Sequence, residues 1–244
     1  NSYFSNSIYA ATGLPSQDEL ELLSPWREQL PPEVFPEPLN PPSTTEPHSL
    51  RQNLLQAKQL LAQAGWHVQN GVLKNTAGRE FRFDILLVDN AFERVIAPYA
   101  NNLKKLGITV EYRSIDPSLY IDRIKNFDFD MVVSRFGQSQ SPGNEQRDYW
   151  SSQAADQPGS RNLAGIKSSV VDALIDTIIY ADTQEKLTTA CRALDRILWY
   201  GYYVVPNWYL SSHRLAYAAW LRQPETLPLY FSAGQWLDTW WRHE

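Results

Sequence analysis

Polar side chains that could bind a ligand gather directly after one short apolar run of the chain. Residues 127–133 alternate apolar and acidic side chains, and the loop that follows carries amides, hydroxyls and one arginine. Such groups can hydrogen-bond the backbone of an extended peptide. Open α/β sheets place their ligands at loops of this kind, beyond the carboxyl ends of strands. A plain solvated connection is the alternative, and the loop's own residues leave both interpretations open.

Carboxylates near the same loop raise the question of catalysis. Asp128 and Asp130 are two residues apart on the predicted strand, so they share a face and could form an acid pair, with Glu145 as a third carboxylate. Asp84 occupies the polar face of another predicted strand, which favours solvated or helix-pairing charges instead. No G-x-S-x-G, P-loop or G-x-G-x-x-G motif is present. A hydrolase is therefore the weaker hypothesis.

Metal and disulfide chemistry have little support in the sequence. The four histidines, His48, His67, His213 and His243, are scattered, and no two have the spacing of metal ligands. The single cysteine, Cys191, excludes an internal disulfide, and its helical surroundings predict a small buried residue. We expect no metal and no cofactor.

The elements that must position the loop follow from hydrophobic periodicity. Apolar residues recur at helical spacing in some segments and alternate in others. Crossovers of helical length imply parallel strands with right-handed connections, and hence a β-α-β-α-β core. The expected elements are a helix at 48–65, a strand at 81–87, a helix at 90–107, a strand at 108–115, a helix from 116, and the strand at 127–133, buried on both faces towards its end.

Helix ends are marked by capping residues. Gly65 and Gly107 stand where helices should close, and Asp116 stands where the third helix should begin. Asn90 and Glu93 have the spacing of a capping box. Pro98 predicts a kink or an early break within that helix.

The two ends of the chain differ in composition from the middle. Residues 1–47 hold nine of the sixteen prolines, so we expect an extended arm that wraps a surface, with aromatic anchors such as Tyr3, Phe4 and Trp26. Disorder is the alternative. Helices are expected at 170–181 and 183–200 and a strand at 202–209. Six of the nine tryptophans fall in the final part of the chain and need a core or a partner to bury them: Trp199, Trp208, Trp220, Trp236, Trp240 and Trp241.

Composition excludes several classes of function. The 244 residues are 43% hydrophobic and 20% charged, with a net charge of -5, so no basic surface indicates nucleic acid or an anionic membrane as a partner. No apolar run approaches the roughly 18 residues that span a bilayer. Because the chain opens at Asn1 without a methionine or a signal-type segment, we expect a piece of a longer protein.

Several long motifs resemble one known family. The runs LLQAKQLLAQAGW, EFRFDILLVD, RNLAGIKSSVVDALI and ACRALDRILWYGYYVVPNWY are similar to the C-terminal lobe of the family 5 extracellular solute-binding proteins, the peptide receptors of ABC importers. NSYFSNSIYAATGLPS and SPGNEQ most resemble its YejA-like branch. The resemblance covers essentially the whole chain. It implies one α/β lobe of a type II periplasmic-binding-protein fold, with the Pro-rich arm and the Trp-rich tail attached.

The resemblance also implies partners and a division of the chain. The receptor would be periplasmic, would close two lobes on a peptide or peptide-like ligand, and would deliver it to membrane permease subunits. Residues 1–47 would be a hinge or wrapping segment, 48–210 the ligand-binding lobe, and 211–244 a tail returning to the missing N-terminal lobe. The expected ligand contacts of this lobe, with Trp208 near the hinge, are Arg135, Phe136, Gln138, Ser139, Gln140, Asn144, Trp150 and Trp208.

One position departs from the pattern of the family. In the oligopeptide receptors an Asp after the equivalent strand pairs with the amino terminus of the peptide. Matching Pro142 to the proline of that motif puts Gln138 at the Asp position, so the charged anchor is missing here. Besides the importer, two hypotheses stay open: a protein-interaction scaffold that uses the arm and tail, and a hydrolase that uses Asp128, Asp130 or Glu145.

Overall fold

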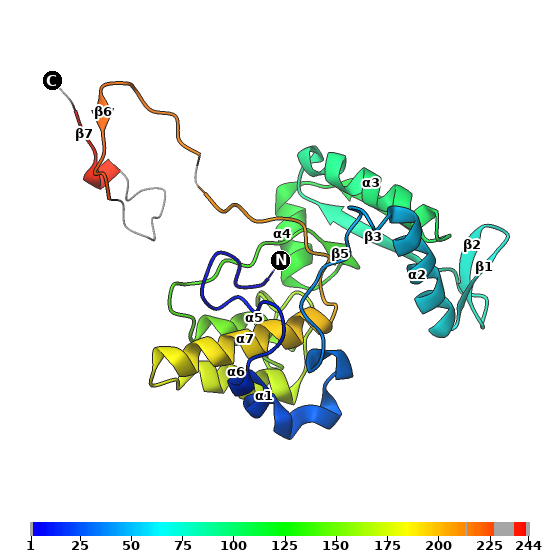
Figure 1. Ribbon diagram of the computed structural model, residues 1–244. Coiled ribbons are helices and arrows are strands. Elements are labelled where there is room, and N and C mark those ends of the chain that lie inside the picture. The colour runs from blue at the N-terminus through cyan, green and yellow to red at the C-terminus, as the bar shows by residue number, and fades with distance from the viewer. Residues whose placement is uncertain (1, 213, 227–236, 243–244) are drawn as a thin grey trace. The chain divides into compact units, whose positions relative to one another are not determined.

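The computed structural model describes residues 2–212, 214–226 and 237–242 (Figure 1). By their contacts the residues divide into two compact units, Asn1–Val205 and Pro206–Glu244. The first unit contains a parallel sheet with its helices and a separate group of packed helices. Two of the four histidines, His213 and His243, and Trp236 of the tail lie outside the described residues.

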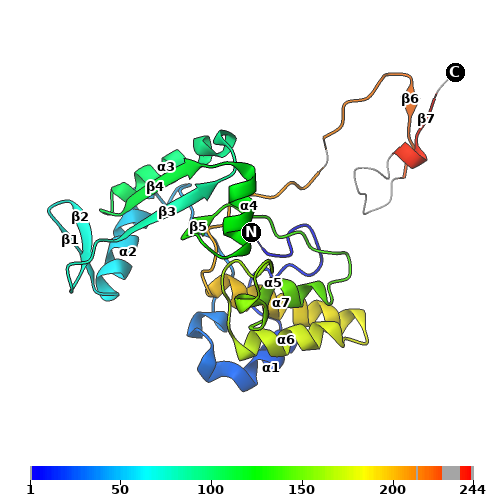
Figure 2. The same cartoon turned by 180° about the vertical axis from the view of Figure 1, so that it is seen from behind.

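The sheet has the predicted β-α-β-α-β order. Strands β3 (Arg82–Leu87), β4 (Thr109–Ser114) and β5 (Met131–Val132) lie in the order β4-β3-β5, and both pairings are parallel. Helix α3 (Glu93–Lys104) connects β3 to β4, and helix α4 (Pro117–Lys125) connects β4 to β5. Figure 2 shows α3 lying along β3 and β4. The prediction of a parallel α/β core is confirmed.

The last strand is much shorter than the sequence predicts. Phe127 has a positive φ of 55°, and the Asp128 backbone N–H donates to the Arg123 carbonyl oxygen at 2.8 Å. These residues therefore belong to the end of α4, and only Met131–Val132 pairs with β3. The predicted strand at 127–133 is wrong over its first half. Met131 and Val132 are half-buried, so the predicted burial on both faces is also wrong.

The caps of the helices agree with the sequence in part. The Asp116 carboxylate accepts from the Ser118 backbone N–H at 2.8 Å, so the predicted cap of α4 is confirmed. A short 3-10 helix, η3 (Asn90–Phe92), precedes α3, and its cap is Asp89. The predicted capping box that begins at Asn90 is therefore wrong. Helix α3 continues through Pro98, so an early break there is also wrong.

A hairpin covers one end of this part of the chain. Helix α2 (Leu50–Gln63) leads into strands β1 (Trp66–Gln69) and β2 (Val72–Asn75), which pair antiparallel. Their turn, Asn70 and Gly71, has φ values of 52° and 81°, as a tight two-residue turn requires. Strand β2 also contacts the residues that follow α3, since the Leu73 backbone N–H donates to the Gly107 carbonyl oxygen at 2.8 Å.

The other helices share a larger core. Helices α6 (Ser169–Ile179) and α7 (Gln184–Tyr200) were predicted and are confirmed, and α1 (Gln17–Leu23) packs against α7 (Figure 1). Helix α5 is Glu145–Trp150, and the 3-10 helices are η1 (Ser24–Gln29), η2 (Pro32–Val34) and η4 (Ala154–Asp156). The N-terminal arm is thus partly helical, so the expectation of an extended arm is wrong over α1, η1 and η2.

The first residues of the chain are held by two neighbouring charges of α7. The Asp195 carboxylate accepts from Ser2 Oγ at 2.6 Å and from the Tyr3 and Ala11 backbone N–H groups, each at 2.8 Å. The Arg196 guanidinium donates to Glu19 at 3.1 Å in a buried ion pair. Apolar packing adds to these bonds, because Phe4 is 0% exposed and lies in the same hydrophobic core as Trp150. The arm and α7 therefore form one packed structure.

The second unit contains little regular structure among its described residues. Strands β6 (Leu221–Arg222) and β7 (Trp241–Arg242) pair antiparallel, and η5 (Leu237–Thr239) is a short 3-10 helix. The predicted strand at 202–209 is wrong, because these residues adopt no strand. Large aromatic side chains of this unit are exposed: Trp208, Tyr209, Tyr217, Trp220 and Trp241.

Candidate functional site

The loop at residues 134–144 follows β5 and ends where α5 begins. Its apolar anchor is Phe136, whose ring lies 4.8 Å from the Trp150 ring and 6.0 Å from the Tyr149 ring between centroids. Tyr3 of the N-terminal arm completes this aromatic group, with its ring 5.7 Å from that of Phe136. Aromatic packing therefore holds one end of the loop against α5.

A chain of hydrogen bonds continues from these rings into the loop. The Trp150 indole N–H donates to Gln146 Oε1 at 3.0 Å, and Gln146 Nε2 donates to Gln138 Oε1 at 2.6 Å. Gln146 is 0% exposed and Trp150 is 1% exposed. Gln138 is thus tied to the core through a fully buried amide.

The Glu145 carboxylate holds the other side of the loop. Its Oε1 accepts from Ser139 Oγ at 2.9 Å, the Gly143 backbone N–H at 3.1 Å and Gln146 Nε2 at 3.2 Å. Partial burial alone would raise the pKa of Glu145, but these hydrogen bonds favour the charged form and lower the pKa below its usual value. Glu145 is therefore ionised and stabilises the loop through these hydrogen bonds, so it is a poor general acid.

The structure brings together most of the predicted ligand contacts. Phe136, Gln138, Ser139 and Trp150 belong to the connected network described above. The Gln140 carbonyl oxygen accepts from the Tyr9 hydroxyl at 2.9 Å, and Arg135 and Asn144 are exposed. Trp208 lies in the second unit. Trp150 is buried, so its ring supports the loop from behind.

Two members of the network were not found from the sequence. Gln146 is one turn before Trp150 on α5, so helical spacing could have placed the two side chains side by side. Tyr9 reaches the loop from the far end of the chain, and no local signal could have shown that contact. Both residues position the loop without lying on its surface.

The two predicted acidic residues lie in a shallow polar hollow of about 230 Å³. Asp128 forms an ion pair with Arg123 at 2.8 Å, and Asp130 accepts from the Asp84 backbone N–H at 2.9 Å. The two carboxylates thus have separate structural partners. This arrangement agrees with the interpretation of Asp128 as a helix-pairing charge.

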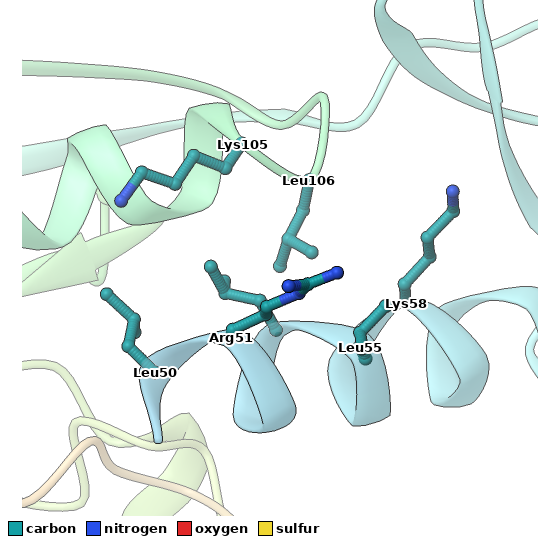
Figure 3. Close-up of a pocket in the computed structure, with 7 residues that line it drawn as sticks. Leu50, Arg51, Leu55, Lys58, Lys105 and Leu106 are labelled. Carbon is teal, nitrogen blue, oxygen red and sulfur yellow. The ribbon is translucent and has the colours of Figure 1, made fainter. Parts of the chain in front are cut away.

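A second hollow, of about 320 Å³, lies between α2 and the end of α3 (Figure 3). Its walls are mainly leucine side chains, with three cationic side chains among them. The lining residues are Leu50, Arg51, Leu54, Leu55, Lys58, Lys105 and Leu106. None of the predicted ligand contacts lines it.

Across the described ranges, no helix is long and apolar enough to cross a membrane. Within the same ranges, no three side chains of His, Cys, Asp and Glu gather as metal ligands would. Cys191 is buried, and this burial raises the pKa of its thiol to about 12.

Comparison with known families decides what kind of protein carries this loop. Residues 24–158, more than half of the chain, match the family described as bacterial extracellular solute-binding proteins, family 5 Middle. The chain belongs to this family. The match includes the parallel sheet, the loop at 134–144 and α5.

Longer relatives of the family extend the match to the two ends of the chain. The probable peptide-binding protein YejA of Agrobacterium fabrum is 41% identical over 98% of this chain. The uncharacterized protein YejA of Escherichia coli is 37% identical over 99% of it. The chain spans 39% of the length of each relative.

A solved structure of the family shows the same fold. The oligopeptide-binding protein AppA of Bacillus subtilis, in complex with a nonapeptide, is 22% identical, and the similarity covers 75% of this chain and 37% of AppA with a TM-score of 0.53. The likeness confirms the expected type II periplasmic-binding-protein fold, of which this chain holds a part.

Proposed function

We propose that the chain forms one lobe of the substrate-binding component of an ABC importer. The complete protein captures peptides or peptide-like compounds in the periplasm and delivers them to membrane permease subunits. Closure of two lobes around the ligand provides the binding free energy and the signal for delivery. This chain supplies the lobe with the loop at 134–144, and residues 211–244 return to the other lobe.

The observation that carries this proposal is the loop itself, in a chain of the solute-binding family. It presents hydroxyl, amide and backbone groups, while the neighbouring carboxylate of Glu145, at the start of α5, is bound internally by three donors. Neutral hydrogen-bonding groups suit the repeated amides of a peptide backbone. The name of the Agrobacterium relative, a probable peptide-binding protein, points to the same ligand class.

Within the loop we assign ligand contacts to the exposed or half-buried side chains Arg135, Phe136, Gln138, Ser139, Gln140 and Asn144. Trp150 acts through Gln146 and Phe136. Trp208 stays a proposed contact near the hinge. A hydrolase is disfavoured because Asp128, Asp130 and Glu145 each have a structural partner.

The test uses the longer protein that contains this chain. The purified protein is denatured, the released compounds are identified by mass spectrometry, and synthetic peptides of the same composition are then titrated into it. We expect intact peptides to be recovered and to bind again without cleavage, with much weaker binding to the 244-residue chain alone. Cleavage of the peptides would support an enzyme, and equal affinity of the chain alone would contradict the two-lobe receptor.

A further inference from the structure

The hydrogen bonds around Gln138 determine which end of its amide is free. An amide side chain can donate through its nitrogen or accept through its oxygen, and its neighbours decide which atom faces them. Gln138 lies at the end of a chain of two hydrogen bonds that starts at Trp150 and passes through Gln146. Each contact has a defined direction.

The direction is set first at Gln146. An indole N–H can only donate, so the Gln146 atom that faces Trp150 must be its oxygen. On the other side, Gln146 faces the Glu145 carboxylate, an ionised group that can only accept. Gln146 therefore has one orientation, with its nitrogen directed towards Glu145 and Gln138.

The orientation of Gln146 in turn determines that of Gln138. Because Gln146 Nε2 donates at 2.6 Å, the Gln138 atom that receives this bond is Oε1. Gln138 Nε2 is left on the other side of the amide. It is buried and has no hydrogen-bond partner among the residues that the structure describes. A buried donor without a partner destabilises the unliganded loop and favours the arrival of an acceptor.

We propose that Gln138 donates its amide N–H₂ to a ligand that displaces the groups now covering it, and that the ligand group it binds is an oxygen acceptor: a carbonyl, a hydroxyl or a carboxylate. An ammonium group is rejected at this position, since two donors would face each other. The inference rests on the proposed peptide-binding function and adds to it the polarity of one contact. Gln146 is the positioning residue that sets this polarity.

The substitution Gln138→Glu tests the direction of the contact. Glu has nearly the same shape, keeps an oxygen for Gln146 and replaces the free N–H₂ by a carboxylate oxygen. The longer protein is offered a pool of synthetic tripeptides, half with free and half with acetylated amino ends, and the retained peptides are measured by mass spectrometry. We expect retention to fall by about tenfold or more.

The possible outcomes separate the inference from the proposed function. Unchanged or increased retention by Gln138→Glu, above all of free-amino peptides, would overturn the inference while the proposed function stands. Absence of retention by the unmodified protein would overturn the proposed function, and the inference with it. Gln157→Glu is the control, because it adds the same charge at an exposed position.

A second variant tests the role of Gln146. Gln146→Met fills a similar volume but cannot donate to Gln138, so the amide of Gln138 can turn either way. In this background, Gln138→Glu should change retention less than it does alone. Equal effects in both backgrounds would show that Gln146 does not set the polarity of Gln138.

Discussion

The Gln146 side chain makes three hydrogen bonds beside the loop, and among the described residues it is the one amide that joins the aromatic group to both Gln138 and Glu145. It accepts from Trp150 and donates to both Gln138 and Glu145, and it is 0% exposed. Water cannot replace these bonds without opening the core. A change of this one side chain therefore affects both the aromatic group and the loop.

The first prediction concerns the stability contributed by this residue. Gln146→Leu should lower the free energy of unfolding by about 1–3 kcal/mol, because the Trp150 indole N–H is left buried without an acceptor. Urea denaturation followed by tryptophan fluorescence measures the change. Gln157→Leu, at an exposed position, should stay within about 0.5 kcal/mol. Equal losses in the two variants would contradict the role of the buried amide.

The second prediction concerns pH. The folded state lowers the pKa of Glu145 from its usual 4.5, so the stability that its ionised form provides is fully present above that value. It is lost as the pH falls below 4.5 through the lowered pKa. Urea midpoints at about pH 6 and about pH 3 should therefore differ more in the unmodified protein than in Glu145→Gln. If the two urea midpoints differed as much in Glu145→Gln as in the unmodified protein, the stabilising role of ionised Glu145 would be contradicted.

At the scale of elements, Gly107 lies between the end of α3 and the beginning of β4, next to strand β2 of the hairpin. Its φ is +82°, and a Cβ atom there would lie 2.8 Å from the Leu73 backbone nitrogen. Gly78 has a similar φ of +77°, but a Cβ atom would meet nothing within 4 Å. Substitutions at these two glycines therefore distinguish the cost of backbone strain from the cost of a steric clash.

The third prediction uses this pair. Gly78→Ala should cost about 1–2 kcal/mol, from the left-handed backbone alone. Gly107→Ala should cost a further 1–3 kcal/mol or so, because the hairpin backbone must move away. Thermal unfolding of the two variants measures the difference. If Gly107→Ala were no less stable than Gly78→Ala, the close approach of β2 to Gly107 would be contradicted.

The sequence predicted the elements whose signals are local. Alternation gave β3, the apolar period gave α6 and α7, and Asp116 marked the beginning of α4. It failed where the turn that ends a helix overrides an alternating pattern. Residues 127–130 alternate like a strand, but the backbone of Phe127 and the bond from Asp128 to Arg123 close a helix instead.

The candidate site shows the same division. The loop and most of its polar residues were predicted from their place after a strand. The direction of the Gln138 amide was not, because it depends on Gln146 and Trp150 on another element. Likewise, Asp195 and Arg196 lie within a helical pattern, and their partners are near the other end of the chain.

At the scale of the whole molecule, the second unit exposes large aromatic surface. Trp220 is 53% exposed and Trp241 is 51% exposed in the 244-residue chain. If residues 211–244 return to the other lobe, these rings become buried in the longer protein.

The fourth prediction is that this burial is measurable. With 5-fluorotryptophan incorporated, the fluorine resonance of Trp220, assigned through Trp220→Phe, should lose most of its H₂O/D₂O shift in the longer protein. Trp150, which is 1% exposed, should show little shift in either protein. A Trp220 resonance that kept its full solvent shift would contradict the return of the tail.

The hydrogen bonds between α7 and residues 2–19 affect the order in which the chain folds. The bonds of Asp195 and Arg196 join residues separated by between 177 and 193 positions. Contacts of such separation form late, because closing so long a loop costs entropy before any bond is made. Residues 2–11 therefore become fixed only after α7 has formed, although they precede it in the chain. Until α7 exists, Phe4 and Tyr9 lack much of the core that buries them, so mutations in α7 should leave residues 2–11 unprotected in a folding chain.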